Sequence, residues 1–411
     1  MSDLTSTPRL DEEYLQNPHE LAARLRAEGP ARPVLMPDGV RVWLVTGHAD
    51  ARALLTDPRL SSDGVYDRLE HARALAEGKK IEFSRSLAAH LLNVDPPDHT
   101  RLRKLVNKAF TSRTIARLRP RIEEITTELL DAMPVGESVD LLAEFALPLP
   151  IRVICELMGI PAEDRERFAG WSGEMVSTAA AEEVGAASAA MAGYLAELVE
   201  SKRANPAEDL LSALVHASDN GDQLAVPELI AMTFVLLIGG YETTVNLIGN
   251  GVLSLLRAPD QLAALRADPG LLPNAVEEFL RFETPNNMAS PRYTRQAVRI
   301  GDIEIPAGEL VLVSLLAGNR DARRFPDPDR LDITRPTGAH LGFGHGIHYC
   351  VGAPLGRLEG EIAIGRLLER FSRIELATDP ASLRWRSSTQ MHGLETLPVR
   401  LWHRAPTPEH D

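Results

Sequence analysis

Hydrophobic residues recur at helical spacing in six segments of the chain. These segments run over residues 19–28, 98–110, 115–133, 164–177, 186–203 and 227–256. Apolar positions three to four residues apart lie on one face of a helix, where they can be buried together. The pattern therefore predicts a chain that is dominated by helices.

Two stretches instead have the character of β-hairpins. Residues 32–36 and 40–46 are extended apolar runs on either side of Pro37-Asp38-Gly39, a turn sequence. A second hairpin is predicted over residues 298–315. Neither an internal repeat nor a long glycine/serine linker interrupts the chain, so we expect residues 1–411 to form a single, mainly α-helical domain with small β-sheets.

The last helical segment, residues 227–256, has an unusual centre. About 30 residues would span roughly 45 Å as one helix, and residues 229–238 are apolar almost all round. Gly239 and Gly240 then follow, at a cost of about 1 kcal/mol each relative to alanine. The Thr243 hydroxyl can bond back to the Gly239 carbonyl and weaken the helix where a ligand could enter. A helix crossing with a capped bend is the alternative interpretation.

Composition and charge argue for a globular protein and against nucleic-acid-binding, disulfide-rich and membrane proteins. The chain is 44% hydrophobic and 25% charged, as in ordinary globular proteins, and its formal net charge of -14 argues against nucleic acid as the main partner. Two cysteines, Cys155 and Cys350, imply no disulfide framework. We find no signal-peptide pattern and no run of roughly 18 apolar residues, and therefore expect a cytoplasmic protein without a membrane span.

The segment from Phe343 to Leu358 carries the strongest chemical signal, because four glycines surround one cysteine. Glycine allows close approach to a flat ligand, and Pro354 suits the first turn of a following helix. Cys350 would precede that helix N-terminus, which lowers a thiol pKa and favours the metal-binding thiolate. A zinc site formed by His345, His348 and Cys350, or an inert buried cysteine, are the alternatives.

This loop resembles the signature of the cytochrome P-450 family, Phe-x-x-Gly-x-(basic)-x-Cys-x-Gly. The matching residues are Phe343, Gly346, His348, Cys350 and Gly352. The resemblance extends over essentially the whole chain and implies a triangular helical prism that binds haem b between the interrupted helix and the cysteine loop. It implies that Cys350 is the axial ligand of the iron, with Gly239 and Gly344 also beside the haem.

The same resemblance gives the interrupted helix a function. Gly239 to Thr243 looks like the oxygen-binding groove, (Ala/Gly)-Gly-x-(Asp/Glu)-Thr, in which Thr243 would bond oxygen and Glu242 would deliver protons. The implied reaction is a monooxygenation that inserts one atom of O2 into an organic substrate by hydroxylation or epoxidation.

Further residues match the family at positions beside the haem and behind it. The expected contacts of the haem propionates are His99, Arg103, Arg292 and His348. Glu278 and Arg281 resemble the family's structural Glu-x-x-Arg pair, and Arg330 is expected to be the arginine that joins them.

The substrate pocket is expected to include Asn286, Asn287, Met288, Ala289 and Met391. Two asparagines beside an apolar cavity suggest a substrate that carries hydroxyl or carbonyl groups, although loop asparagines more often bond backbone. The resemblance points to actinobacterial members that act on polyketides and macrolides, and steroid or terpenoid-like compounds are also compatible.

Residues 99–121 contain eight basic side chains and no acidic one in an otherwise acidic chain. This asymmetry suggests docking of an acidic partner, with Arg101, Lys104 and Lys108 as contacts; a solvated helix face is the alternative. The expected partner is a ferredoxin reduced by an NAD(P)H-ferredoxin reductase. A peroxide-driven peroxygenase and a non-catalytic haem-thiolate scaffold are the alternative functions, and both are disfavoured by the acid-threonine pair.

Overall fold

The computed structural model describes residues 7–77, 84–176, 181–219 and 222–403. Helices make up most of them. The helices are α1 (Glu12–Gln16), α2 (Pro18–Glu28), α3 (His48–Leu55), α4 (Val65–Glu77), α5 (Asp98–Ala109), α6 (Ser112–Asp131), α7 (Pro148–Met158), α8 (Arg165–Val176), α9 (Ala181–Ala204), α10 (Leu210–Val215), α11 (Val226–Arg257), α12 (Pro259–Ala267), α13 (Leu272–Phe282), α14 (Leu315–Gly318) and α15 (Ala353–Arg370).

All six helices expected from hydrophobic spacing are present, as α2, α5, α6, α8, α9 and α11, with ends that differ by up to about five residues. Residue 177, the last of the predicted 164–177 helix, lies outside the described residues. The helical periodicity therefore located these six helices, whereas α4 and α7 were not among the predicted segments.

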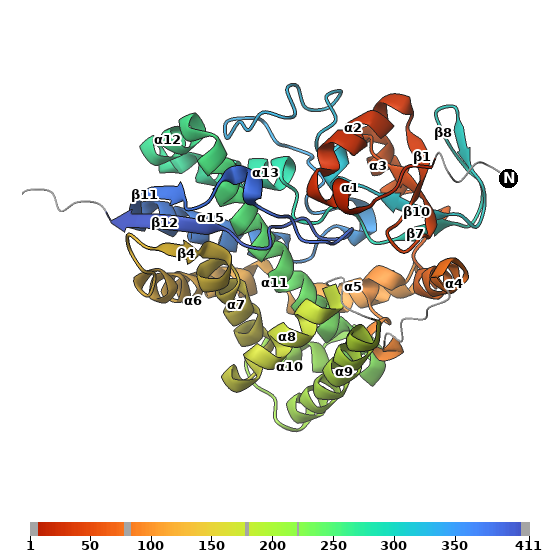
Figure 1. The fold of residues 1–411 in the computed structure, drawn as a ribbon. Helices are drawn as coiled ribbons and strands as arrows, with labels where there is room; N and C mark the ends of the chain where they lie inside the picture. The colour runs from red at the N-terminus through yellow and green to blue at the C-terminus, as the bar shows by residue number, and fades with distance from the viewer. Residues whose placement is uncertain (1–6, 78–83, 177–180, 220–221, 404–411) are drawn as a thin grey trace, which may run out of the picture.

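The strands form small sheets. They are β1 (Ala31–Leu35), β2 (Arg41–Val45), β3 (Leu60–Ser61), β4 (Ser138–Asp140), β5 (Ser218–Asp219), β6 (Asp222–Gln223), β7 (Arg292–Thr294), β8 (Val298–Ile300), β9 (Ile303–Ile305), β10 (Leu310–Val313), β11 (Phe371–Leu376) and β12 (Pro398–His403). One sheet has the order β1-β2-β10-β7-β3 and another the order β11-β12-β4. Figure 1 shows these two sheets on opposite sides of α11.

The first predicted hairpin is confirmed. Strands β1 and β2 are antiparallel, with Leu35 opposite Arg41, and Gly39 in the turn has φ 77°. The second hairpin was predicted too long, because only β8 and β9 pair with each other. β10 instead joins the larger sheet, parallel to β2 and antiparallel to β7. Strand β10 is buried at every position, which a sheet interior explains better than a hairpin arm.

Helix α11 crosses the centre of the molecule and packs against α7, α9, α13 and α15. By its length and composition, this helix could cross a membrane. The expectation that the chain has no run of roughly 18 apolar residues was therefore wrong. However, 67% of its most apolar window is buried inside the protein. The helix is therefore used as the core around which the other helices pack.

Candidate active site

The cysteine loop folds back on itself before α15 begins. The Cys350 backbone N–H donates to the Phe343 carbonyl at 2.9 Å, and the Gly344 N–H donates to the Leu341 carbonyl at 2.8 Å. Gly344 and Gly346 have φ values of 71° and 77°, the left-handed region that glycine adopts without strain. These glycines therefore permit the tight path that presents the Cys350 side chain.

The Cys350 sulfur lies at the N-terminus of α15, whose N-cap is Gly352. Burial raises the pKa of the Cys350 thiol, while the N–H of Gly352 and the charge of Arg103 act in the opposite direction. The expected lowering of this pKa was therefore wrong for the chain by itself, because desolvation outweighs the helix N-terminus. A bound metal ion would deprotonate a coordinating thiol outright.

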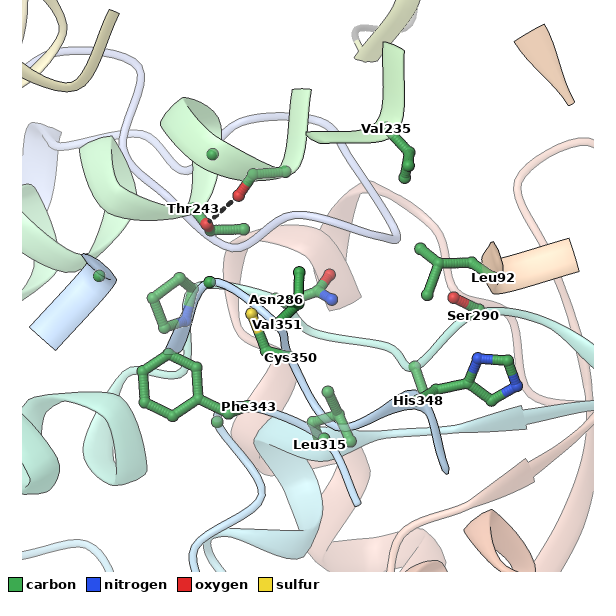
Figure 2. A pocket seen from close by; sticks show the side chains of 18 of the residues that line it. Leu92, Val235, Thr243, Asn286, Ser290, Leu315, Phe343, His348, Cys350 and Val351 are labelled. Carbon is green, nitrogen blue, oxygen red and sulfur yellow. Dashed lines mark hydrogen bonds between the residues drawn. The ribbon is translucent and has the colours of Figure 1, made fainter. Parts of the chain in front are cut away.

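A large cavity separates this loop from α11. It encloses about 1390 Å³ of space free of protein atoms, part of it open to solvent. Residues of α11, of the cysteine loop and of the segment 285–292 line this space. Figure 2 shows Cys350 and Phe343 on the loop side of the cavity, with Thr243 on the α11 side.

Cationic and imidazole side chains gather at one edge of the cavity. Arg103, Arg292 and His348 line it, and the His99 ring packs against the His348 ring with centroids 4.6 Å apart. His99 Nε2, Arg292 Nε and His348 Nδ1 are buried and have no hydrogen-bond partner among the described residues. Burial lowers the pKa of Arg292 to about 10 and that of His348 to about 3.

Buried polar atoms without a partner are costly, so this edge is incomplete without an anionic or polar ligand. The carboxylates of a haem meet this requirement, and Arg103 and Arg292 keep fixed orientations because they also donate to the carbonyls of Tyr349 and Leu55 at 2.8 and 3.1 Å. Together with the thiol opposite α11, the residues present fit a haem.

Two adjacent glycines in α11 have different roles. A Cβ at Gly239 would meet nothing within 4 Å, whereas a Cβ at Gly240 would lie 2.7 Å from Ile154 Cδ1 of α7. Gly239 therefore keeps the cavity wall open, and Gly240 permits close packing of two helices. The Thr243 hydroxyl lines the cavity and donates to the Gly239 carbonyl at 2.9 Å, as predicted.

Glu242 does not line the cavity. Its side chain is buried, and its Oε2 lies 2.6 Å from Nη1 of Arg386, in the segment that precedes β12. Sequence reasoning missed Arg386, because the two residues are 144 positions apart. The acid beside Thr243 therefore has a fixed cationic partner behind the helix.

Only part of the predicted substrate pocket is confirmed as cavity wall. Asn286 and Ala289 line the cavity, but Asn287, Met288 and Met391 are not among its lining residues. Sequence reasoning missed several apolar wall residues, namely Leu55, Phe110, Ile154 and Leu247.

Asn287 is a structural residue and not a pocket residue. Its side chain is buried, its Nδ2 lies 3.1 Å from the Tyr14 hydroxyl, and its Oδ1 accepts from Ser314 Oγ at 3.2 Å. Met288 belongs to the apolar cluster under the larger sheet. Met391 forms a backbone bridge with Asn286 and packs behind it. The bonds of Asn287 to Tyr14 and Ser314 hold its side chain in the protein interior, away from the cavity.

The Glu-x-x-Arg pair is present but has a different third member. Glu278 and Arg281 are fully buried, with Oε2 and Nε 2.7 Å apart. Arg335 Nε donates to Glu278 Oε1 at 3.2 Å, whereas Arg330 is exposed and contributes only its backbone carbonyl. The assignment of Arg330 was therefore wrong by five residues, because several arginines follow one another in this irregular segment.

Only two of the three basic residues predicted to contact an acidic partner are exposed. Arg101 forms an ion pair with Glu228 at the start of α11, so its charge is matched within the protein. Lys104 and Lys108 are exposed. At 100° per residue these positions face away from the side of α5 that carries His99 and Arg103.

The alternative of a zinc site in the cysteine loop gains no support. The cluster of potential metal ligands found among the described residues does not include His345, His348 or Cys350.

Comparisons with known proteins agree with this geometry. The family Cytochrome P450 matches residues 172–393. The chain is 53% identical to cytochrome P450 107B1 of Saccharopolyspora erythraea, covering 95% of this chain and 96% of that protein. It is 48% identical to the vitamin D(3) 25-hydroxylase of Pseudonocardia autotrophica, with the same coverage.

A solved structure is equally similar. The tirandamycin C-bound P450 monooxygenase TamI aligns with a TM-score of 0.90 and 53% identity, covering 96% of this chain and 100% of that one. These relatives show both the fold and the reaction class. The chain therefore belongs to the cytochrome P450 family of haem-thiolate monooxygenases, whose cofactor is haem b.

Proposed function

We propose that this monooxygenase oxidises one C–H or C=C bond of a medium-sized, largely apolar natural product, and that Cys350 would supply the thiolate that holds the haem iron. The observation that carries the assignment is the position of Cys350 across a large cavity from Thr243. At the edge of that cavity, His99, Arg292 and His348 each have a buried nitrogen without a hydrogen-bond partner among the described residues.

Four residues would hold the haem carboxylates: His99, Arg103, Arg292 and His348. Arginine binds carboxylates in a bidentate manner, and both arginines already have backbone partners that restrict their side chains. Phe343 and Gly344 would pack beside the ring, and Gly352 leaves the space beside the Cys350 sulfur free. When bound, a thiolate-ligated haem supplies the activation of O2 that leads to O–O cleavage.

The chain's own contribution to the chemistry is proton control. The Thr243 hydroxyl is fixed by its bond to the Gly239 carbonyl, so its oxygen is held at the cavity wall as an acceptor and relay. Glu242 is the nearest acid in sequence. Once its carboxylate leaves Arg386, it would take up a proton from solvent, turn toward Thr243 and pass that proton on. The pair with Arg386 would thus keep the Glu242 carboxylate close to the cavity but outside it until a proton is needed.

Substrate class follows from the wall of the cavity and from the relatives. Most lining side chains are aliphatic or aromatic, and the polar ones, such as Asn286 and Ser290, are few. Apolar sites with a few polar groups bind hydrophobic compounds in a fixed orientation. The relatives are named for vitamin D(3) and tirandamycin C. We propose a polyketide or macrolide, with a steroid or terpenoid-like compound as the next candidate class.

We further propose that electrons come from a ferredoxin and an NAD(P)H-ferredoxin reductase in the cytoplasm. Lys104 and Lys108 offer exposed positive charge on α5, and Ile347 and Tyr349 are 48% and 39% exposed on the cysteine loop itself. An acidic partner would suit the lysines of α5, and an apolar contact would suit the exposed side chains of the loop. Free Cys155 and Cys350 suit a reducing compartment.

We propose that the chain acts as a single domain.

The carbon monoxide spectrum of the reduced protein tests the assignment of Cys350. We expect a long-wavelength Soret band for the wild type and for Cys155→Ala, the matched control at the other, buried cysteine. Cys350→Ala should lose that band. A wild type that binds no haem, or a Cys350→Ala variant with an unchanged band, would overturn the proposal.

Turnover tests the route of electrons. With ferredoxin, reductase and NADPH, we expect the wild type to form product and Thr243→Ala to consume NADPH with much less product. Efficient turnover with hydrogen peroxide alone would favour the peroxygenase alternative. A protein with the thiolate spectrum that oxidises no member of a polyketide, macrolide and steroid panel by either route would favour the scaffold alternative.

A further inference from the structure

A second group of metal-ligating side chains lies outside the haem site. It comprises His19 in α2, Glu283 directly after α13 and His392 in the segment before β12, whose ligand atoms all lie within 4.8 Å of one another. Nε2 of His19 lies 3.1 Å and Nε2 of His392 lies 2.8 Å from the same carboxylate oxygen, Glu283 Oε2. Three potential ligands therefore converge on one point from three distant parts of the chain.

The spacing of these atoms suits a tetrahedral metal ion. Zinc binds imidazole nitrogen and carboxylate oxygen at about 2.0–2.1 Å, which places neighbouring ligands about 3.3 Å apart. The two observed N···O distances would lengthen by about 0.2 and 0.5 Å when the metal replaces the bridging protons, and the two nitrogens lie within 4.8 Å of each other. We propose that His19, Glu283 and His392 form a zinc(II) site whose fourth ligand is water.

The surroundings hold these ligands in place. The indole ring of Trp385 stacks on the His392 ring with centroids 4.0 Å apart. Arg320 Nη2 donates to the other oxygen of Glu283, Oε1, at 3.0 Å and leaves Oε2 to the histidines. Contacts of this kind orient the side chains that bind a metal. His19 Nδ1 is buried without a partner among the described residues, so Nε2 is the ring nitrogen that the protein binds.

The charges at the cluster are compatible with a divalent cation. Burial acts to raise the pKa of Glu283, but the charge of Arg320 and the hydrogen bonds from His19 and His392 hold it well below the ordinary value, so the carboxylate is ionised. Burial lowers the pKa of His19 and keeps its imidazole neutral, as a ligand must be. Arg320 is the nearby cation, and Asp329 pairs with it at 2.9 Å and offsets its repulsion of the metal.

The site would connect the N-terminal helix to the cavity wall. The His392 backbone N–H donates to the Pro285 carbonyl at 2.8 Å, and Pro285 lines the cavity. Asn250 Nδ2 of α11 donates to the carbonyls of Glu283 and His392 at 3.2 and 2.9 Å. A bound zinc ion would therefore fix α2 onto the two segments that support the substrate cavity. The His19 side chain is 25% exposed, which leaves a route of entry.

Zinc binding to the haem-loaded, tag-free protein tests this proposal. The affinity for Zn²⁺ is measured by competition with a chromophoric chelator, for the wild type, His19→Gln, His392→Gln and the exposed-histidine control His216→Gln. We expect one zinc ion per chain for the wild type and control, and at least about tenfold weaker binding for the other two variants.

Two further measurements identify the site. Zinc-edge absorption of the wild type should show two imidazole ligands, and zinc should raise the Tm of the wild type but not of His19→Gln or His392→Gln. A wild type that binds no stoichiometric zinc, or variants that both bind like the wild type, would refute the site. If His392→Gln does not fold, His19→Gln decides, because its side chain is partly exposed. Carbon monoxide spectra of the same samples report the haem site separately.

Discussion

Glu242 and Arg386 form an ion pair behind the oxygen-side wall of the cavity, with Oε2 and Nη1 2.6 Å apart. Glu242 comes from α11 and is 4% exposed, whereas Arg386 comes from the segment before β12 and is 26% exposed. The pair thus ties the central helix to the C-terminal part of the chain, one residue away from Thr243. Any movement of Glu242 toward the cavity has to break this contact.

Removing the arginine should therefore destabilise the protein. Arg386→Gln leaves a buried carboxylate without its cation, and we expect the free energy of unfolding to fall by about 2 kcal/mol. The double variant Glu242→Gln/Arg386→Gln should recover part of that loss, because no buried charge remains. Urea unfolding of the four proteins of this cycle measures the coupling. Additive effects of the two substitutions would show that the contact contributes no stability.

The sequence reveals local arrangements far better than distant pairings. The cysteine loop, the β1–β2 turn and the bond from Thr243 to Gly239 lie within a few consecutive residues, so turn chemistry and spacing are sufficient to predict them. Arg386 is 144 positions from Glu242, and Tyr14 is 273 positions from Asn287. No local periodicity encodes these contacts, because they depend on how the sheets and helices pack.

The two glycines of α11 should respond in opposite ways to alanine. Gly240→Ala forces a methyl group to within 2.7 Å of Ile154, so we expect a loss of about 1–2 kcal/mol in the free energy of unfolding. Gly239→Ala meets no protein atom and gains helix propensity, so stability should be unchanged or about 1 kcal/mol higher.

The functional effects of these variants should be reversed. The methyl group of Gly239→Ala projects into the cavity, so substrate binding and turnover should weaken more than in Gly240→Ala. Urea unfolding and substrate-binding spectra of both variants separate the two effects. Equal losses of stability would contradict the different roles that we assign to the two glycines.

Arg335, and not Arg330, should be the arginine that stabilises Glu278. Arg335→Gln removes one of the charged donors to a fully buried carboxylate, and we expect it to cost about 2 kcal/mol of unfolding free energy. Arg330→Gln is the matched control and should change stability by less than about 0.5 kcal/mol, because its side chain is exposed. Thermal unfolding followed at the haem band compares them. A larger loss in Arg330→Gln would show that Arg330, and not Arg335, stabilises Glu278.

The error over Arg330 has a physical origin. The segment between Phe325 and Leu341 contains no helix or strand longer than a turn among its described residues, so spacing gives no face on which to place a side chain. Arg335 reaches Glu278 because the chain curls around it, and the Arg330 carbonyl accepts from both Arg281 and Arg335. Irregular segments of this kind are specified by their hydrogen bonds rather than by periodicity.

His90 provides a pH-dependent element of stability beside the cavity. It is 6% exposed, and its Nδ1 accepts from the Leu92 backbone N–H at 3.3 Å. The next two residues, Leu91 and Leu92, line the cavity. Burial lowers the pKa of His90 to about 4, so the folded protein favours the neutral imidazole. Protonation of this side chain therefore works against the folded state.

The sign of the pH effect follows from this shift. An unfolded histidine titrates near 6.5, so the stability contributed by neutral His90 is complete above that pH and is lost as the pH falls toward 4. Between pH 7.5 and 5.0 we expect the wild type to lose about 2 kcal/mol of unfolding free energy through this residue. His90→Gln should lack that part of the pH dependence, whereas His71→Gln, at an exposed position of α4, should retain it. Urea unfolding at the two pH values measures the difference, and the same pH dependence in all three proteins would show that His90 can be protonated in the folded state without cost.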